Sequence, residues 1–335
     1  MTKQKALIIT YYDAPNYGAF LQAYAMQEFL RTNGVEGEVL GHRANKPTVI
    51  TKLLDKRLPL AVIDYRNQIQ KRVDEAQRYL NVTAGKGEYD LAIIGSDEIW
   101  NVKNLTAIHL PAFFRPYARA KKTISYAACA GKCQGKHMKL LPYTCGIRKL
   151  NAVSVRDEYT ELTIKDFGVE NPVRTLDPTF LYDFGAELPE RTIQEDYLLV
   201  YTYGLGQEEI DAIQNFARKQ NLKIIATGSR CGWADENPVP APFEWLSLIK
   251  YSKYVVTSTF HGSVFSIILN KQFVAIATQS NKVKSLLNEL RLNARLVTQA
   301  ERVEAVLTET IDFAQVNEIK QEKRNASAAF VFANL

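Results

Sequence analysis

Short apolar segments alternate with segments of helical spacing along most of the chain, and the apolar segments end in small polar residues. Residues 5–12 form the first apolar segment, a turn follows at 13–18, and residues 19–32 carry apolar side chains at helical spacing. Asn33 and Gly34 end that helix, and a second strand covers residues 38–41. This β-α-β order predicts a parallel sheet.

A polar stretch at residues 183–196 interrupts the alternation, which resumes at residue 197. We interpret this stretch as an interdomain linker. Before it, the pattern predicts strands at 89–94, 122–128, 152–155 and 173–176, and helices at 140–150 and 158–167. After it, the pattern predicts strands at 197–203, 223–227, 254–256 and 273–276, and helices at 207–220, 243–251, 264–269, 281–290 and 301–329.

The two parts have the same β-α pattern, and 335 residues are more than one small core needs. We therefore expect an α/β protein with two Rossmann-like domains that face each other across a cleft. Residues 1–185 would form the first domain and residues 186–335 the second. The last helix is expected to reach back to the first domain.

Composition excludes several classes of function. Hydrophobic residues make up 46% of the chain and charged residues 23%, which is ordinary for a globular protein. A net charge of +6 suits anionic ligands or an anionic membrane surface, but it is too weak and scattered to indicate nucleic-acid binding. No apolar run approaches the roughly 20 residues of a membrane span, so we expect a cytoplasmic protein, with peripheral membrane contact left open.

Metal binding is not indicated either. The four cysteines (Cys129, Cys133, Cys145 and Cys231) match no zinc spacing, and only four histidines are present. Reduced thiols are the expectation. Residues 43–86 are polar and basic, with apolar residues at helical spacing, and we interpret them as a solvated helical excursion. Contact of its basic face with lipid phosphates or an acidic acceptor is the alternative.

Residues 253–276 contain the strongest candidate chemistry, because a strand, a tight turn and a helix follow one another there. His261 would lie at the start of the helix, at the carboxyl edge of the sheet, where open α/β folds bind ligands. Free backbone N–H groups at that helix end attract anions, and the helix dipole disfavours a protonated imidazole. A neutral histidine beside an anion is a good candidate for acid/base chemistry.

The alternative is a buried histidine that caps the helix and contacts no substrate. A cluster of hydroxyl groups favours the functional interpretation, because a purely structural turn does not need so many donors. The hydroxyl residues of the cluster are Thr257, Ser258, Thr259 and Ser263.

Other polar residues are expected at the same kind of strand end. The turn after the first strand holds Asn16, Tyr17 and Gly18, with Gln22 one helical turn later, although Asn and Gly are also ordinary turn residues. Ser96 and Asp97 follow the strand at 89–94, where Asp97 could instead cap the next turn.

Arg156 follows the strand at 152–155, where an anion-binding arginine would be placed. An ordinary ion pair with a neighbour is its alternative role. The stretches NYGA, GSDEIW, SVRD, LDPT and FHG, together with ISYAACAG, occur in this order along the chain.

Taken together, these stretches resemble the polysaccharide pyruvyl transferase family, from about residue 5 to about residue 295. The resemblance implies a glycosyltransferase-B-like fold, with no metal and no cofactor. It further implies that phosphoenolpyruvate, as co-substrate, donates its pyruvyl group to two hydroxyls of a nucleotide- or lipid-linked saccharide in surface-polysaccharide biosynthesis. A homo-oligomer is compatible with the family.

The resemblance also implies roles for individual residues. His261 would be the acid/base and Arg156 would hold the anionic donor. Ser258, Thr259, Gly262, Ser263, Lys282 and Lys284 would line the donor site, and Asn16, Tyr17, Gly18, Gln22, Ser96 and Asp97 the acceptor site. Some members carry an arginine two residues before the histidine; Thr259 stands there in this chain and cannot form a bidentate clamp on a carboxylate.

Two other functions fit the same pattern. A nucleotide-sugar-dependent glycosyltransferase of this fold would bind a uridine or guanosine nucleotide in the cleft. A non-catalytic saccharide-binding protein would bind sugar without turnover, and its binding would not depend on the acid/base role of His261.

Overall fold

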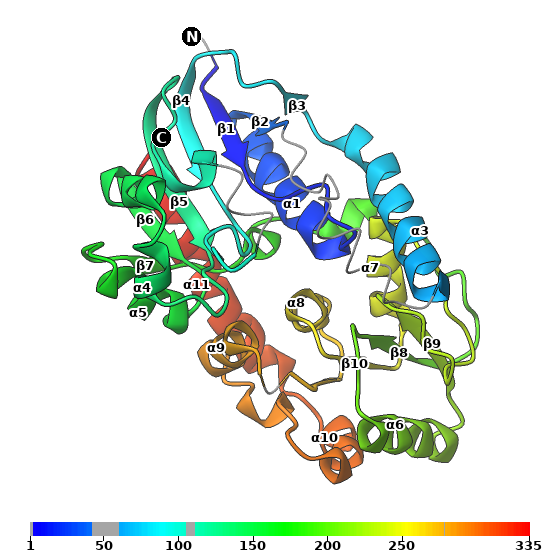
Figure 1. The fold of residues 1–335 in the computed structure, drawn as a ribbon. Helices are drawn as coiled ribbons and strands as arrows, with labels where there is room; N and C mark the ends of the chain where they lie inside the picture. Colours follow the sequence, from blue (N-terminus) through cyan, green and yellow to red (C-terminus); the bar gives the residue numbers. More distant parts are fainter. Residues whose placement is uncertain (1–2, 42–59, 105–110, 278) are drawn as a thin grey trace.

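A computed structural model of the chain describes residues 3–41, 60–104, 111–277 and 279–335. Its strands form two parallel sheets, one from the first part of the sequence and one from the second (Figure 1). Among the described residues, no helix is long and apolar enough to cross a membrane.

The first sheet has seven strands in the order β3-β2-β1-β4-β5-β6-β7. Its central strands are buried on both faces, which explains why they read as continuous apolar runs rather than alternating ones. The strands are β1 (Lys5–Ile9), β2 (Glu36–Leu40), β3 (Val82–Thr83), β4 (Tyr89–Ile94), β5 (Ala120–Ala128), β6 (Ala152–Val155) and β7 (Val173–Arg174).

The second sheet has four strands in the order β11-β10-β8-β9. Every residue of β8 is buried, and its register pairs Val200 with Val256 of β10. The strands are β8 (Tyr197–Tyr201), β9 (Lys223–Thr227), β10 (Tyr254–Thr257) and β11 (Phe273–Ala275).

Helices connect the strands of both sheets (Figure 1). The longest, α11, runs from the second part back to the first sheet, where the Ser327 hydroxyl accepts from the Leu176 N–H at 2.9 Å. The helices are α1 (Tyr17–Thr32), α3 (Leu60–Ala76), α4 (Gly135–Met138), α5 (Glu158–Asp166), α6 (Gln207–Lys219), α7 (Pro242–Tyr251), α8 (Phe260–Ile268), α9 (Asn281–Glu289), α10 (Val303–Thr308) and α11 (Phe313–Phe332).

Two predicted helices were wrong in form. The helix expected at 140–150 is a 3-10 segment, Pro142–Lys149, which begins at a proline. The single helix expected at 301–329 is two helices, α10 and α11. The break occurs because the carboxylate of Asp312 accepts from the N–H groups of Ala314 and Gln315 and starts a new helix.

The polar excursion predicted at 43–86 is described only from residue 60, and residues 43–59 lie outside the described part. Helix α3 buries Tyr65, Ile69 and Val73 against the rest of the molecule. The Tyr65 hydroxyl donates to the Pro238 carbonyl at 2.8 Å, and Arg72 donates to the Val239 carbonyl at 3.1 Å. One face of α3 therefore binds the second part of the chain.

Each sheet reverses its strand order at one place. In the first sheet the reversal lies between β1 and β4, and in the second it lies between β8 and β10. Loops after the strands on either side of such a reversal separate and leave a crevice, where doubly wound folds bind ligands. The prediction of two Rossmann-like domains in a glycosyltransferase-B-like arrangement is confirmed.

Aromatic side chains join the two sheets. Tyr17, at the start of α1, stacks on Trp245 of α7 with ring centroids 5.3 Å apart, and Trp245 also lies 4.6 Å from Tyr201 and 5.5 Å from Phe265. Trp245 is fully buried. One hydrophobic cluster therefore spans both parts of the chain.

We predict that Trp245→Ala lowers the free energy of unfolding by about 3–5 kcal/mol, because it removes a large buried ring shared by both sheets. Urea unfolding followed by circular dichroism measures this change. Trp233→Ala, at a half-buried loop position, is the matched control and should cost much less. Equal losses in the two variants would contradict the role given to the shared cluster.

Candidate functional site

The loops at the two strand-order reversals meet between the sheets. Gly18, in the first turn of α1, lies against His261, in the first turn of α8. A Cβ atom at Gly18 would lie 2.1 Å from both Cγ and Nδ1 of the His261 ring. Only glycine allows α1 to approach the imidazole this closely.

A buried carboxylate organises the polar groups around this contact. Oδ2 of Asp177 accepts from the Ser96 hydroxyl at 2.9 Å and from Nη1 of Arg156 at 3.0 Å, and it lies 3.8 Å from Nε2 of His261. Its Oδ1 accepts from the N–H and the hydroxyl of Thr179 at 3.1 and 2.8 Å. Asp177 therefore holds residues from both sheets in one cluster.

The charges in the cluster compensate one another. Burial alone would raise the pKa of Asp177, but the His261 imidazole, the Arg156 guanidinium and the Thr179 N–H hold it well below its usual range. Arg156 is also buried and reaches Asp97 with Nη2 at 3.4 Å. Asp177 stays ionised, and Arg156 stays paired with two carboxylates.

His261 sits in a pre-ordered helix end. The Thr259 hydroxyl caps α8 by accepting from the Gly262 N–H at 2.9 Å. The imidazole is 5% exposed, and its Nε2 has no hydrogen-bond partner among the described residues. The Asp177 carboxylate, 3.8 Å away, is the charged group beside this nitrogen, so the atom is a candidate to hold or move a proton.

Two cations lie on the Phe260 ring beside His261. The Arg156 guanidinium carbon is 4.2 Å from the ring centroid and Nζ of Lys282 is 5.6 Å from it. Lys282, from α9 of the second part, pairs with Glu98 of the first part at 2.7 Å. The Lys282 ammonium lowers the pKa of Glu98 to about 2, against burial, which acts to raise it.

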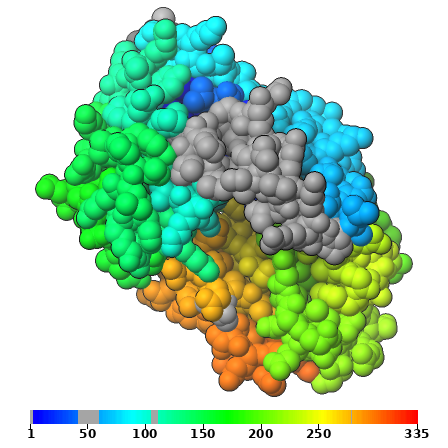
Figure 2. All heavy atoms as spheres, viewed as in Figure 1, coloured from blue at the N-terminus to red at the C-terminus, as the bar shows by residue number. Residues whose placement is uncertain are grey.

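A cleft of about 910 Å³ opens beside this cluster. We call it the interdomain cleft, because both parts of the chain line it. The first part contributes Glu98, Lys103 and Lys132, and the second contributes Tyr203, Ser258 and Lys282. Figure 2 shows that the two parts form opposite ends of the molecule, the first in cyan and green and the second in yellow and orange.

The predicted acceptor residues are close to the cluster but mostly engaged. Asn16 caps α1 through the Gly18 N–H at 2.8 Å, and Tyr17 is buried on Trp245. The Gln22 side chain donates to Thr10, Tyr11 and Ala19 and accepts from the Ser96 N–H at 3.2 Å. Of this set, Asn16 is half-buried and the Asp97 side chain is 15% exposed.

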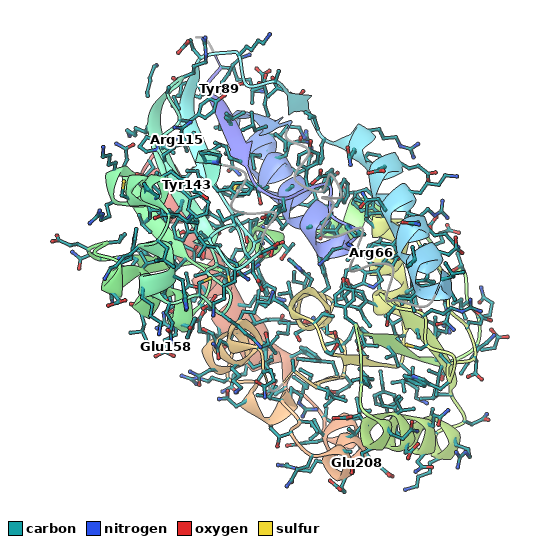
Figure 3. All side chains as sticks on the ribbon, viewed as in Figure 1. Arg66, Tyr89, Arg115, Tyr143, Glu158 and Glu208 are labelled. Atoms are coloured by element: carbon teal, nitrogen blue, oxygen red, sulfur yellow. The ribbon has the colours of Figure 1, made fainter. Side chains whose placement is uncertain are left out.

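The predicted donor residues separate into three places. Ser258 lines the interdomain cleft and bonds Thr202 at 2.8 Å, while the Ser263 hydroxyl is buried and donates to the Thr259 carbonyl at 3.0 Å. Lys284 lines a different hollow between α5 and α9. Glu158, which is labelled in Figure 3, lies on the same side of the molecule as this hollow. Its N–H donates to the Ser285 hydroxyl.

Three residues of the site had no role in the sequence analysis: Asp177, Glu98 and Tyr203. Asp177 belongs to the LDPT stretch and follows the last strand of the first sheet, so the strand-end argument could have selected it. Tyr203 lies two residues past the end of β8, because the strand is shorter than the predicted 197–203. Nothing local marks Glu98, whose partner is 184 residues away.

Comparison with protein families gives a match over most of the chain. The family model described as polysaccharide pyruvyl transferase matches residues 16–280, which include every element of the cluster around Asp177. A search of curated proteins found no significant match.

Solved structures share the fold over nearly the whole chain. A putative UDP-N-acetylglucosamine 2-epimerase from Listeria monocytogenes has a TM-score of 0.52 and 9% identity, covering 99% of this chain and 96% of its own. An S. aureus MnaA–UDP co-structure has a TM-score of 0.53 and 10% identity, with coverages of 98% and 95%. At such identities the likeness concerns the fold alone.

We predict that Gly18→Ala lowers the free energy of unfolding by about 1–3 kcal/mol, because the new Cβ overlaps the His261 ring. The intrinsic helix propensity of alanine acts in the opposite direction, so a loss reports the overlap. In a double-mutant cycle with His261→Gly, urea unfolding should give a coupling of at least about 1 kcal/mol. Gly232→Ala, in open space, is the control; strict additivity would contradict the contact.

The lowered pKa of Glu98 predicts a pH-dependent stability. Because the folded-state pKa lies below the ordinary value of 4.5, ionised Glu98 stabilises the fold above that pH, and this contribution disappears as the pH falls toward about 2. Wild type should exceed Glu98→Gln by on the order of 2 kcal/mol at neutral pH, given partial exposure.

Urea unfolding at about pH 7, 5, 4 and 3 tests this, and the difference between the two proteins should shrink below about pH 5. Glu208→Gln, at an exposed position in the first turn of α6 at the far end of the second part (Figure 3), is the control and should stay within about 1 kcal/mol of wild type. A difference that stays constant across this range would show that the Lys282–Glu98 pair does not stabilise the fold through the charge of Glu98.

Proposed function

Because the chain belongs to the polysaccharide pyruvyl transferase family, we propose that it transfers the pyruvyl group of phosphoenolpyruvate to two hydroxyls of one sugar. The product is a cyclic ketal in a surface polysaccharide. The observation that carries the proposal is the buried cluster of His261, Asp177 and Arg156 at the facing strand-order reversals, inside the matched residues. Phosphoenolpyruvate is a cytoplasmic metabolite, which places the proposed reaction in the cytoplasm.

The proposed reaction moves two protons. The methylene carbon of phosphoenolpyruvate gains one and becomes a methyl group, so that C2 becomes electrophilic. One sugar hydroxyl adds to C2, phosphate leaves with the C2–O bond electrons, and the second hydroxyl closes the ring. Of the two hydroxyl protons, one balances the new methyl group and the other leaves on phosphate.

His261 is the residue we assign to proton transfer. Its Nε2 is buried, has no hydrogen-bond partner among the described residues, and faces the ionised carboxylate of Asp177 at 3.8 Å. That carboxylate compensates the charge of the ring while the ring holds a proton. Gly18 fixes the ring from the other side.

Lys282 and Arg156 are the cations we assign to the anionic donor. Arg156 is committed to Asp177 and Asp97, while its Nε has no partner among the described residues. Lys282 is held by one carboxylate, Glu98, at the wall of the cleft. Thr259 caps α8 rather than reaching into the cleft, so Lys282 would supply the positive charge that an arginine at that position would have given.

The test is release of inorganic phosphate from phosphoenolpyruvate, with and without a panel of nucleotide- and lipid-linked saccharides. Wild type should release phosphate only with an acceptor. His261→Ala should lose at least about 100-fold in rate, the usual range for loss of a general acid or base. His137→Ala, in α4 and outside the cluster, is the matched control and should retain activity.

Other results would support other functions. A melting temperature raised by a uridine or guanosine sugar nucleotide and unchanged by phosphoenolpyruvate would indicate a glycosyltransferase. Saccharide binding that His261→Ala leaves intact, without turnover of any donor, would indicate a binding protein. Glu208 and Glu209 lie in the first turn of α6, next to the turn after β8, and their negative charges would repel the phosphate of a sugar nucleotide bound there. This arrangement does not favour the glycosyltransferase.

A further inference from the structure

One long stretch of the first part carries charge of a single sign. Residues 99–156 contain eleven lysines and arginines but no aspartate or glutamate, so all 36 acidic residues of the chain lie outside them. Protein surfaces ordinarily mix the two signs, because charges of one sign repel each other. A stretch of this composition indicates a surface that meets a negatively charged partner.

Some of these cations are already compensated in the folded protein. Arg119 pairs with Glu88 at 3.0 Å and Lys121 with Asp90 at 2.7 Å, while Arg156 belongs to the buried cluster. Five others are exposed and have no acidic partner among the described residues: Arg115, Lys136, Lys139, Arg148 and Lys149. We call the surface that carries these five the basic face.

Two of the segments that carry these cations pack against the end of α5. Helix α4 begins there, because a Cβ at Gly135 would lie 2.2 Å from a carboxylate oxygen of Asp166. The guanidinium carbon of Arg148 lies 5.4 Å from the ring centroid of Phe167, the next residue. The cations of α4 and Arg148 therefore share one supporting element.

The 3-10 segment that ends at Lys149 connects α4 with Arg115. The Thr144 hydroxyl donates to the Met138 carbonyl at 2.8 Å, which ties the segment to α4. A Cβ at Gly146 would lie 2.6 Å from the Cβ of Arg115, so the segment also lies on that residue. The green part of Figure 2, which includes this segment, forms an outer edge of the molecule.

Two acidic residues adjoin the basic face. Asp166 borders the start of α4, and Glu170 lines the same hollow as Arg148. Both are exposed, and neither forms an ion pair among the described residues. Even with both counted, the cations of the face outnumber these carboxylates by five to two, so the face keeps an excess of positive charge.

The basic face also exposes apolar side chains. Leu140 follows Lys139 and is 76% exposed, and Pro142 is exposed beside it. A single exposed leucine is ordinary. Its position among uncompensated cations is informative, because cations with an apolar side chain between them match both layers of a membrane surface, the phosphate headgroups and the acyl boundary beneath them.

Nucleic acid is a less suitable partner for this face. Single strands stack their bases on exposed aromatic rings that lie among cations. Tyr143, the aromatic residue nearest to Leu140 in sequence, is half-buried and packs on Phe114 with ring centroids 5.4 Å apart. The basic face presents leucine and proline where base stacking needs rings, which favours lipid.

We propose that the basic face docks the protein on a membrane surface that carries anionic phosphate headgroups, with Leu140 inserted at the level of the headgroups. The proposal goes beyond the proposed function and does not depend on it, since no step of pyruvyl transfer uses these residues. Lys132, from the same acid-free stretch, lines the interdomain cleft, so docking brings the first-part wall of the cleft toward the bilayer.

The test is co-sedimentation of the full chain with vesicles, without phosphoenolpyruvate or saccharide. One set of vesicles is phosphatidylcholine alone, and the other is an equimolar mixture of phosphatidylcholine and phosphatidylglycerol. We expect at least about tenfold tighter binding to the anionic vesicles, because several cations each gain from the surface potential. Raising the salt from about 0.05 M to about 0.5 M should remove most of this preference.

Charge reversal on the basic face separates local from total charge. Lys136→Glu combined with Lys139→Glu should weaken binding to anionic vesicles by about tenfold or more. The matched control is Lys71→Glu combined with Lys250→Glu, which changes the net charge equally at exposed positions of α3 and α7, on the other side of Figure 1 from α4. The control should bind at least several times more tightly than the basic-face variant.

Substitution of Leu140 tests its insertion. Leu140→Asp should weaken binding to anionic vesicles by roughly tenfold, because it removes the apolar contact and adds a negative charge. Leu60→Asp, at an 83% exposed leucine of α3, adds the same charge and is the control. Both leucines are exposed, so both variants should keep the wild-type melting temperature, which shows that any lost binding is not lost folding.

Three results would overturn the proposal: equal binding of wild type to neutral and anionic vesicles, equal losses in the two double reversals, or equal losses in Leu140→Asp and Leu60→Asp. Displacement of the protein from anionic vesicles by single-stranded RNA at lower concentration than the lipid would assign the face to nucleic acid instead. Failure of the proposed function is separate, because it appears as absent phosphate release and leaves vesicle binding unchanged.

Discussion

The ionised carboxylate of Asp177 is the group on which the geometry of the site depends. It is fully buried and is the closest counter-charge of Arg156, whose guanidinium is itself out of contact with solvent. Removing one partner of such a pair leaves a buried, uncompensated charge, at a cost of about 3–5 kcal/mol. Arg156 also reaches Asp97, and Asp177 lies beside His261. This one charge therefore orders the segments that follow β4, β6 and β7 of the first sheet and the start of α8 in the second part.

That order requires the two sheets to keep one relative position. Interfaces between domains that move are usually small and polar. Here the stacking of Tyr17 on Trp245 continues into the cores on both sides, and Gly18 leaves no gap against the His261 ring. The ring is therefore in place before any substrate binds, and the cleft lies to one side of a fixed contact rather than across a hinge.

The sequence predicts this arrangement as far as local rules extend. The carboxyl ends of parallel strands meet at one edge of a sheet, which is enough to place Ser96 and Arg156 near one another. His261 follows a strand of the second sheet, so its place beside them depends on the expectation that the two sheets face each other across a cleft. The strand-end rule does not decide which of Lys282 and Lys284 faces the interdomain cleft. Two residues along a helix differ by about 200° in direction, so one lysine faces the cleft and the other a separate hollow. The partnerships of Asp177 and Glu98 join distant segments, and no local pattern signals them.

The distribution of charge decides how an anionic substrate enters. Arg156 is paired with two carboxylates and Lys282 with one, so both cations of the candidate site are engaged and the carboxylates outnumber them before any ligand binds. Under the proposed function, a donor that binds Lys282 competes with Glu98 for it, and the released carboxylate becomes an acceptor at the cleft wall. A sugar hydroxyl entering there would meet an oxygen able to receive its hydrogen bond. This chain has Thr259 where some family members carry an arginine, so the donor's counter-charge would be Lys282. Because donor binding would free Glu98 from Lys282, donor binding and acceptor binding would be coupled.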